Sequence, residues 1–498
     1  MQFFIDIALI LVYLWIFLIL IAYVWKFWMM YVNEQHLSGL KYVMLEIKLP
    51  REINKSPQAF EYVANAILQG GGIGKPYHVR WLGALPAMSS LEIASIEGTI
   101  HFYIRIQTKF RSLIEANLYA QYPNIEVVEA DDYTKLIRYE HNKKDVSMWG
   151  SSFVLSKTFK VINKEGKTYK KKDGKDYEMS ADFLPIKTYV DYGLDKDPKE
   201  EFKNDPIISL LEFFGSIGEG QYAWYQLLLQ DESVFDKKFP KAYLNKESHE
   251  RISLKELADF RKKQIRSSSI KEKGEKVFDE QGYPVFEKTK EGEKEVQKTY
   301  QKDTVSSKKE TELTPEEKDE IEAINKKISK PLARAAVRIL YVAKKDKFNP
   351  GHIATIMSSM KPFNGINAFR PNTVADPYDY PWQNTFKKRV PWRSEELFND
   401  YVERAGFHPH AGIIKSDKKI YLLEDLFFYN FKASTRNLFH TIYETILHPF
   451  GHPEPSDVFT LNTEEIATLY HFPGETATVP TLPRIDSIKS KAPTNLPV

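Results

Sequence analysis

An uncharged apolar stretch near the N-terminus constrains this chain more than any other sequence feature. Residues 7–25 are all hydrophobic, and a helix of that length at about 1.5 Å per residue covers about 28 Å, close to the hydrocarbon thickness of a bilayer. Aromatic residues flank the stretch on both sides. The pattern predicts a transmembrane anchor over residues 1–32. The residues assigned to this anchor are Ile7, Leu11, Trp15, Leu18, Ala22 and Trp25.

A cleaved signal peptide is the alternative for this stretch. A signal peptide has a shorter apolar core, a basic residue before it and small residues at its cleavage site, and this segment has none of these. Asp6 precedes the stretch, whereas basic residues follow it from Lys26 onward. The positive-inside rule then predicts a single-pass membrane protein with a short N-terminus outside and a large C-terminal part in the cytoplasm.

The charge balance limits the classes of partner. The 498 residues include 70 Lys and Arg against 67 Asp and Glu, a formal net charge of +3. A chain this close to neutral is not a bulk nucleic-acid binder by charge alone. The chain has no cysteine, so no disulfide framework supports an exported domain.

The first soluble part, residues 33–150, has the pattern of a β-α-β-β-α-β sandwich. Ser56-Pro57 starts a helix, because Ser is a good N-cap and Pro suits the first helical position. Glu97-Gly98 divides an apolar run into the two strands of a hairpin. The strands are expected at 42–49, 91–96, 99–106 and 125–128, with a second helix after Thr108. This order is that of a ferredoxin-like fold.

The same order returns in residues 151–371. A strand is expected at 183–189, a hairpin between the strands 221–230 and 335–343, and helices after Asp205-Pro206 and Asn349-Pro350. A long charged insertion, residues 231–331, separates these two strands. Its centre at 262–312 has too few apolar residues to form a packed core, so we expect disorder or a mobile charged helix there. Thr314 and Glu317 form a capping box that starts a helix leading back into the fold.

Residues 372–498 form a C-terminal extension of different composition, rich in Pro and aromatic residues. We expect helices at 395–403 and 462–470, the second capped by Asn462 with Glu465 at its third position. The tail after Val479 holds four prolines and predicts an extended arm. The expected fold class is therefore α+β: one transmembrane helix, two ferredoxin-like units and an irregular extension.

No motif predicts catalysis. The Gly-rich run at 69–76 fails as a phosphate loop, because Gln69 stands where Gly is required and Pro76 where Ser or Thr is required. The C-terminal histidines lack regular ligand spacing, and solvent-exposed or capping roles are the simpler interpretation for them. These histidines are His408, His410, His440, His448 and His452. We expect no catalytic residue, no cofactor and no metal ion.

The sequence around residues 459–498 resembles a known family. FTLNTEEIATLYHFPGETATVPTLPRIDSIKSKAPTNLPV is similar to the segment just before the motor in conjugation-type (type IV secretion) coupling ATPases of the FtsK/HerA-like group, as found in bacteria. The pieces LEIASIEGTIHFYIRI and DFLPIKTYVD resemble the membrane-proximal region of such chains. This chain has no Walker A or Walker B motif, so ATP binding is not carried over.

The resemblance implies a non-enzymatic, membrane-anchored component of a DNA or protein translocation system, which scaffolds a P-loop ATPase encoded separately. The residues expected to dock that partner are Asn462, Glu465, Tyr470, Phe472, Pro473 and Pro483. The alternative is a membrane-tethered nucleic-acid-binding module that presents His101, Tyr103 and Arg105 to bases. Self-association into a homo-oligomer stays open.

Overall fold

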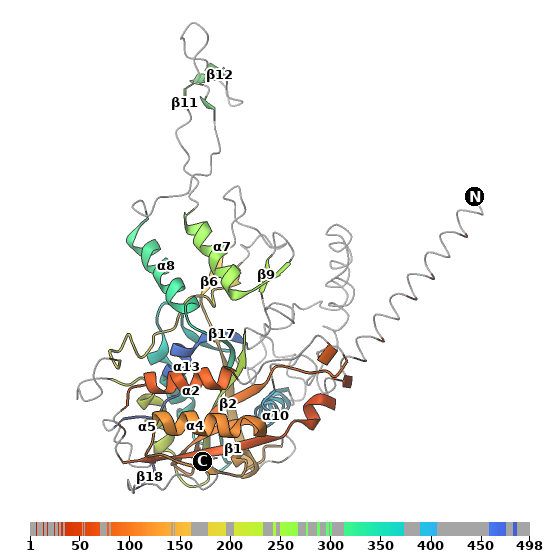
Figure 1. Ribbon diagram of the computed structural model, residues 1–498, viewed down its shortest axis with the longest axis vertical. Helices are drawn as coiled ribbons and strands as arrows, with labels where there is room; N and C mark the ends of the chain where they lie inside the picture. The colour runs from red at the N-terminus through yellow and green to blue at the C-terminus, as the bar shows by residue number, and fades with distance from the viewer. Residues whose placement is uncertain are drawn as a thin grey trace. The chain divides into compact units, whose positions relative to one another are not determined.

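In a computed structural model of the chain, the described residues form an α+β fold around a sheet of ten strands (Figure 1). The structure describes scattered positions before residue 35 and then, with short internal gaps, 35–69, 77–160, 178–195, 204–232, 243–266, 313–372, 389–405, 458–474 and 482–485. Four short strands between 275 and 300 are also described. Contacts between Cα atoms divide the chain into two units.

The sheet belongs to the first unit and is almost entirely antiparallel. Its strand order is β16-β5-β15-β8-β2-β3-β1-β18, with β17 beside β15 and β4 beside β1. The parallel pair is β1 with β18. The bounds are β1 Tyr42–Pro50, β2 Met88–Ile96, β3 Thr99–Gln107, β4 Glu126–Glu129, β5 Val146–Leu155, β8 Gln221–Asp231, β15 Leu332–Lys344, β16 Phe369–Asn372, β17 Phe459–Asn462 and β18 Arg484–Ile485.

Helices cover the two faces of this sheet unequally. One face, here called the helical face, carries most of the apolar core, and side chains such as Phe102 and Leu227 pack there against several helices. Four of these helices are labelled in Figure 1: α2 Gln58–Gln69, α4 Arg111–Gln121, α5 Ile208–Ser216 and α13 Thr463–Leu469. The fifth is α9 Gly351–Ser359. On the other face, here called the α10 face, Trp224 and Leu340 pack against α10 Arg389–Val402.

Several local predictions are confirmed. The hairpin turn at Glu97-Gly98 has φ values of 53° and 91°, as a two-residue turn between twisted strands requires. β8 and β15 pair antiparallel along their length. Asp205 and Asn349 each accept a backbone N–H at the start of the helix that was expected to follow them. The capping box of Thr314 and Glu317 is complete.

The prediction of two separate ferredoxin-like units is wrong. β2 and β8, which were expected in different units, pair antiparallel from Met88↔Gln230 to Ile96↔Tyr222, so both sets of strands belong to one sheet. The physical reason is that periodicity shows which side chains of a strand are buried but not which strand lies beside it. An open strand edge leaves backbone N–H and C=O groups unpaired. Here β2 of the first predicted unit and β8 of the second pair with each other, so neither is an open edge.

The strand expected at residues 183–189 is also wrong, because these residues form turns and irregular backbone. Side chains of α13 accept two of the backbone N–H groups that would pair with a neighbouring strand if this segment were a strand. The Ile186 N–H donates to Glu465 Oε1 at 2.9 Å and the Tyr189 N–H donates to Thr468 Oγ1 at 2.9 Å. In each of these two hydrogen bonds the partners are 279 positions apart, so local apolar composition could not predict them.

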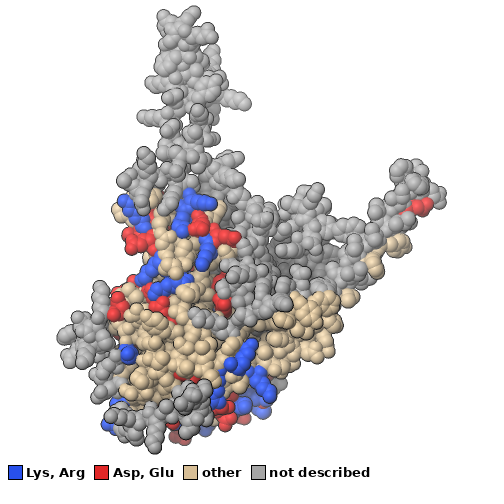
Figure 2. Space-filling model, viewed as in Figure 1, with Lys and Arg blue, Asp and Glu red and all other residues tan. Residues whose placement is uncertain are grey.

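The second unit contains residues 156–185 and 240–329. It includes β6 Thr158–Lys160, β7 Glu178–Ser180, β9 Tyr243–Asn245, β10 Glu250–Ile252, α7 Leu254–Arg266 and α8 Pro315–Ile328, with short ribbons formed by β11 Glu275–Lys276, β12 Phe286–Lys288, β13 Glu295–Gln297 and β14 Thr299–Tyr300. Arg261 on α7 binds both carboxylate oxygens of Glu320 on α8, at 2.8 and 3.2 Å. Figure 2 shows basic and acidic side chains intermixed over these helices. The disorder expected at 262–312 stays a prediction.

The predicted membrane anchor and single-pass localisation are corrected. Within the part of the chain that the structure describes, no helix combines the length and the apolarity needed to cross a bilayer. A span requires an unbroken apolar helix of about 20 residues, and apolar composition alone does not supply one. The positions assigned to the anchor, Ile7, Leu11, Trp15, Leu18, Ala22 and Trp25, lie outside the described residues.

Candidate functional site

A buried ionic cluster lies on the α10 face, where α10 ends over β2. Glu92 is fully buried in the middle of β2, and Arg404 follows α10 with its side chain 2% exposed. The Arg404 Nε and Nη2 atoms each lie 3.0 Å from an oxygen of Glu92. Nη2 also lies 3.0 Å from Asp132 Oδ1. One guanidinium therefore joins α10, β2 and the segment after β4.

The backbone of Arg404 is shaped for this contact. Its φ of 52° lies in the left-handed region, which terminates many helices and usually holds Gly or Asn. The Ala405 N–H donates to the Asp400 carbonyl and the Arg404 N–H donates to the Tyr401 carbonyl, so the end of the helix is hydrogen-bonded. Most helices that end in this conformation have a glycine here, which has no side chain. In this protein the residue is an arginine, and its side chain contacts Glu92 on the sheet.

Neutral donors complete the coordination of Glu92. Ser90 Oγ donates to Glu92 Oε1 at 2.6 Å, the Tyr133 hydroxyl donates to Oε2 at 2.7 Å, and Gln226 Nε2 donates to Oε1 at 3.2 Å. The Tyr133 and Tyr401 hydroxyls lie 2.8 Å apart. We call Ser90, Glu92, Asp132, Tyr133, Gln226, Tyr401 and Arg404 the Glu92 cluster.

In the Glu92 cluster the electrostatics keep Glu92 and Asp132 ionised and Arg404 protonated near neutral pH. Burial by itself would raise the pKa of Glu92, but the Arg404 guanidinium and the hydrogen bonds together lower it. The same opposition of burial and Arg404 leaves the pKa of Asp132 below its usual value. Burial raises the pKa of Tyr133 and Tyr401 well above the usual value, so both hydroxyls stay protonated. The cluster is suited to fastening α10 to the sheet rather than to exchanging protons near neutral pH.

A second group of buried polar residues lies on the helical face, in residues 459–472, which we call the C-terminal strap. Asn462 and Glu465 form a complete capping box at the start of α13, as the sequence predicts. The box is fully enclosed: Glu465 Oε2 accepts the Asn462 N–H at 2.8 Å and Oε1 accepts the Ile186 N–H at 2.9 Å. The cap therefore also positions the irregular segment that contains Ile186.

Lys330 fastens the same strap by charge. Its Nζ lies 2.9 Å from a carboxylate oxygen of Glu61 on α2 and 3.0 Å from one of Glu464 on α13. Burial alone would lower the pKa of Lys330, but the two carboxylates raise it. Glu61 also accepts from the Tyr189 hydroxyl and from Thr463 Oγ1, both at 2.9 Å. The strap is thus held to α2 and to the start of β15 by one cation between two anions.

The residues predicted to dock a partner lie mostly in this interior. Asn462, Glu465, Tyr470, Phe472 and Pro473 are buried, and only Pro483 of the predicted set is exposed. Phe472 packs against Phe60, Phe102 and Tyr122 with ring centroids 5.0 to 5.7 Å apart. The structure brings the first five together around α13, as part of the core rather than as an open surface.

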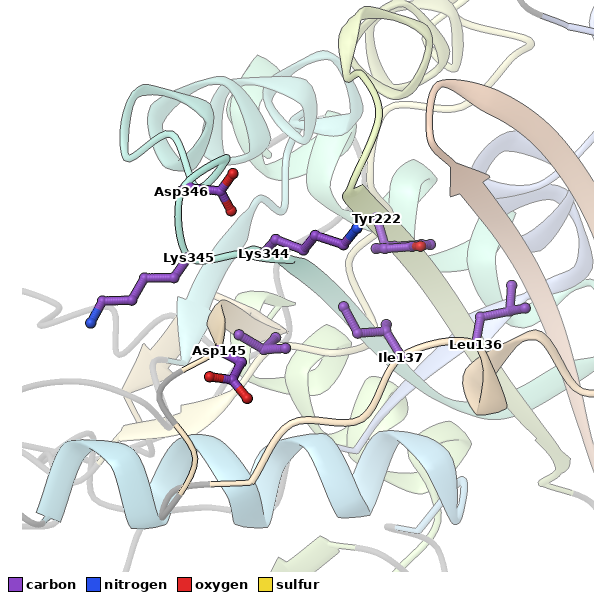
Figure 3. Close-up of a pocket in the computed structure, with 8 residues that line it drawn as sticks. Leu136, Ile137, Asp145, Tyr222, Lys344, Lys345 and Asp346 are labelled. Carbon is purple, nitrogen blue, oxygen red and sulfur yellow. The ribbon is translucent and has the colours of Figure 1, made fainter.

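A groove lies at one end of the α10 face. Its volume is about 670 Å³ and it is bordered by Leu136, Ile137, Asp145, Val146, Tyr222, Lys344, Lys345 and Asp346. In Figure 3 the Lys344 side chain extends toward Tyr222, whereas Lys345 points away from the groove. The charged side chains around it are two lysines and two aspartates, so the rim attracts neither anions nor cations strongly.

The residues proposed for nucleic-acid contact are engaged within the protein. His101 Nδ1 lies 2.6 Å from Glu46, the Tyr103 ring stacks on Tyr133, and the Arg105 guanidinium lies 4.0 Å above the Tyr42 ring. The described residues hold no group of three or more His, Asp or Glu side chains arranged for a metal ion. His408, His410, His440, His448 and His452, and the Gly-rich residues 70–76, lie outside the described part of the chain.

No family model, curated protein or solved structure matches this chain. Sequence reasoning missed Glu92, Asp132 and Arg404. The available signal was a single carboxylate in an otherwise apolar strand, LEIASI, since a buried charge needs a partner. The sequence did not indicate which residue that partner is.

Proposed function

We propose that this chain is a non-enzymatic scaffold in a type IV secretion or conjugation-like translocation system, acting with a P-loop ATPase supplied by a separate chain. The observation that supports this best is the position of the C-terminal strap. The segment that resembles the lead-in to the motor is not a loose tail here, because β17 pairs with β15 and α13 is buried against α2.

The path of the chain after the strap supports a mechanical role. β17 pairs with β15, whereas β18 pairs with β1 at Leu49 and Pro50. The Arg484 Nη1 atom donates to the Pro50 carbonyl at 3.1 Å. A partner that binds next to β18 would therefore be coupled through β1 to the whole sheet, which is what a scaffold for a motor requires.

The use of buried charge also supports a scaffold. Arg404 fastens α10 through Glu92 and Asp132, and Lys330 fastens α13 through Glu61 and Glu464. Each of these groups fixes the position of a helix. Truncating one partner of such a buried pair leaves an uncompensated charge, so pairs of this kind resist separation of the elements they join.

The proposal is tested by mixing the purified full-length chain with a P-loop ATPase encoded beside it. The two proteins should elute together from a size-exclusion column, and the chain alone should not hydrolyse ATP. Pro483→Arg, beside β18, should reduce co-elution, whereas Leu113→Arg at an exposed position of α4 should not. Failure of the wild-type chain to co-elute, or ATP hydrolysis by the chain alone, would overturn the proposal.

A further inference from the structure

His471 lies where the C-terminal strap leaves α13, and its side chain is almost completely buried, at 2% exposure. Its ring lies between two elements that are far apart in sequence. Nδ1 is 2.8 Å from the Ala467 carbonyl oxygen in α13, and Nε2 is 2.9 Å from Asp205 Oδ2, just before α5.

Both ring nitrogens therefore face oxygen acceptors. A neutral imidazole has one N–H donor and one lone pair, so it can satisfy only one of these contacts, whereas an imidazolium satisfies both. Removing the proton would leave a nitrogen lone pair directed either at the Ala467 carbonyl or at the Asp205 carboxylate. The geometry fits the charged ring.

The positions of the two helix ends favour the same charge state. Ala467 lies in the last turn of α13, where unpaired carbonyls attract a cation. Asp205 Oδ1 accepts the Ile207 N–H at 3.0 Å, so the carboxylate that holds His471 also organises the start of α5. The pair consequently connects the C-terminal end of α13 to the N-terminal end of α5.

The other charged groups on the surrounding elements have different partners. Glu61, the charged residue of α2, binds Lys330, and so does Glu464 of α13. Glu465 accepts backbone N–H groups, β17 carries no charged residue, and Glu212 of α5 is exposed. Burial raises the pKa of the nearby Tyr189 and Tyr470 hydroxyls, so both are neutral. Asp205 is thus the charge that controls the ring among the described residues.

We propose that the His471–Asp205 pair is a protonation-controlled latch on the C-terminal strap. The charged ring fastens the strap to α5, and loss of its proton breaks one of the two hydrogen bonds and loosens the strap. Burial disfavours the charged ring, but Asp205 and the backbone acceptors outweigh it and raise the pKa of His471 above 6.5. The latch is therefore closed below that raised pKa and opens as the pH increases through it. The latch does not depend on whether an ATPase binds.

Hydrogen exchange of the full-length chain, followed by mass spectrometry at about pH 6 and about pH 9 and corrected for intrinsic exchange, tests the latch. Peptides covering residues 459–472 should exchange about tenfold faster at the higher pH, while β8 peptides keep their protection. In His471→Gln and Asp205→Asn the strap should exchange fast at both pH values. His101→Gln removes a partly exposed histidine–carboxylate pair elsewhere on the sheet and should retain the wild-type profile.

Equal strap protection at both pH values in the wild type, or the wild-type pH dependence in His471→Gln, would overturn the latch. If the variants do not fold, ¹⁵N NMR of the histidine rings in the wild-type chain supplies the answer. A buried histidine that is an imidazolium near neutral pH and loses its proton at higher pH supports the proposal. The proposal is overturned if the histidine signals show that every buried ring is neutral near neutral pH.

Discussion

Arg404 and Glu92 are 312 positions apart in the sequence, yet their side chains form a two-pronged ion pair with both N···O distances at 3.0 Å. The pair joins the left-handed end of α10 to the centre of β2. Glu92 is fully buried, so it cannot be solvated if Arg404 is removed.

Replacing Arg404 by leucine should therefore destabilise the protein strongly. The change leaves two carboxylates without their cation, one of them fully buried, and breaking a buried pair in this way costs about 3–5 kcal/mol. Arg111→Leu is the matched control, since Arg111 pairs with Glu115 and Glu129 near the surface and such pairs contribute about 0–1 kcal/mol. Urea unfolding measures both. Equal losses in the two variants would contradict the assigned role.

We expect protonation of Asp132 to contribute to the loss of folding stability in acid. Its pKa is lowered in the folded state, so its stabilising contribution is present above the usual carboxyl pKa of about 4 and is lost as the pH falls through the folded-state value. Asp132→Asn should thus lower the melting temperature near neutral pH and flatten its decline in acid. Asp131→Asn, at the exposed neighbouring position, should leave the curve unchanged. A wild-type acid limb in Asp132→Asn would show that this carboxylate is not linked to stability.

Lys330→Met should loosen the C-terminal strap. The substitution retains most of the side-chain volume but removes the cation between Glu61 and Glu464. Because Lys330 is 31% exposed, water screens part of the effect, and we expect a loss of about 1–2 kcal/mol. Lys41→Met at an exposed position is the control. Proteolysis under native conditions should detect faster cutting near the strap only in Lys330→Met, and equal rates in both variants would argue against this ion pair as a fastening.

Gly98→Ala should disturb the hairpin of β2 and β3. Gly98 has a φ of 91°, and a Cβ there would lie 2.5 Å from the Ile217 carbonyl oxygen. Both the backbone conformation and the close approach disfavour a side chain, at a cost of about 1–3 kcal/mol. Gly39→Ala meets no atom within 4 Å and should be close to neutral. Comparing the two melting temperatures checks the prediction, which fails if Gly98→Ala is as stable as Gly39→Ala.

Local signals in the sequence predicted features that depend on residues a few positions apart. The turn at Glu97-Gly98 depends on the freedom of Gly to adopt positive φ, and the capping boxes of Thr314 with Glu317 and Asn462 with Glu465 close within three residues. Pairing of β8 with β15 was also predicted, because the two are the middle strands of the expected β-α-β-β-α-β order, on either side of the charged insertion.

Relations between distant segments came only from the tertiary structure. Apolar periodicity could not show that β2 and β8 are neighbours, that the Ile186 and Tyr189 N–H groups donate to α13, or that Asn462 and Phe472 are buried. Nor could it assign Arg404 to Glu92 or His471 to Asp205.

The sequence by itself determined which groups would need a partner, since turns, caps and buried charges follow from local chemistry. The packing of the whole chain decided which partner each one has, because burial and a pairing over hundreds of positions arise only when the elements assemble.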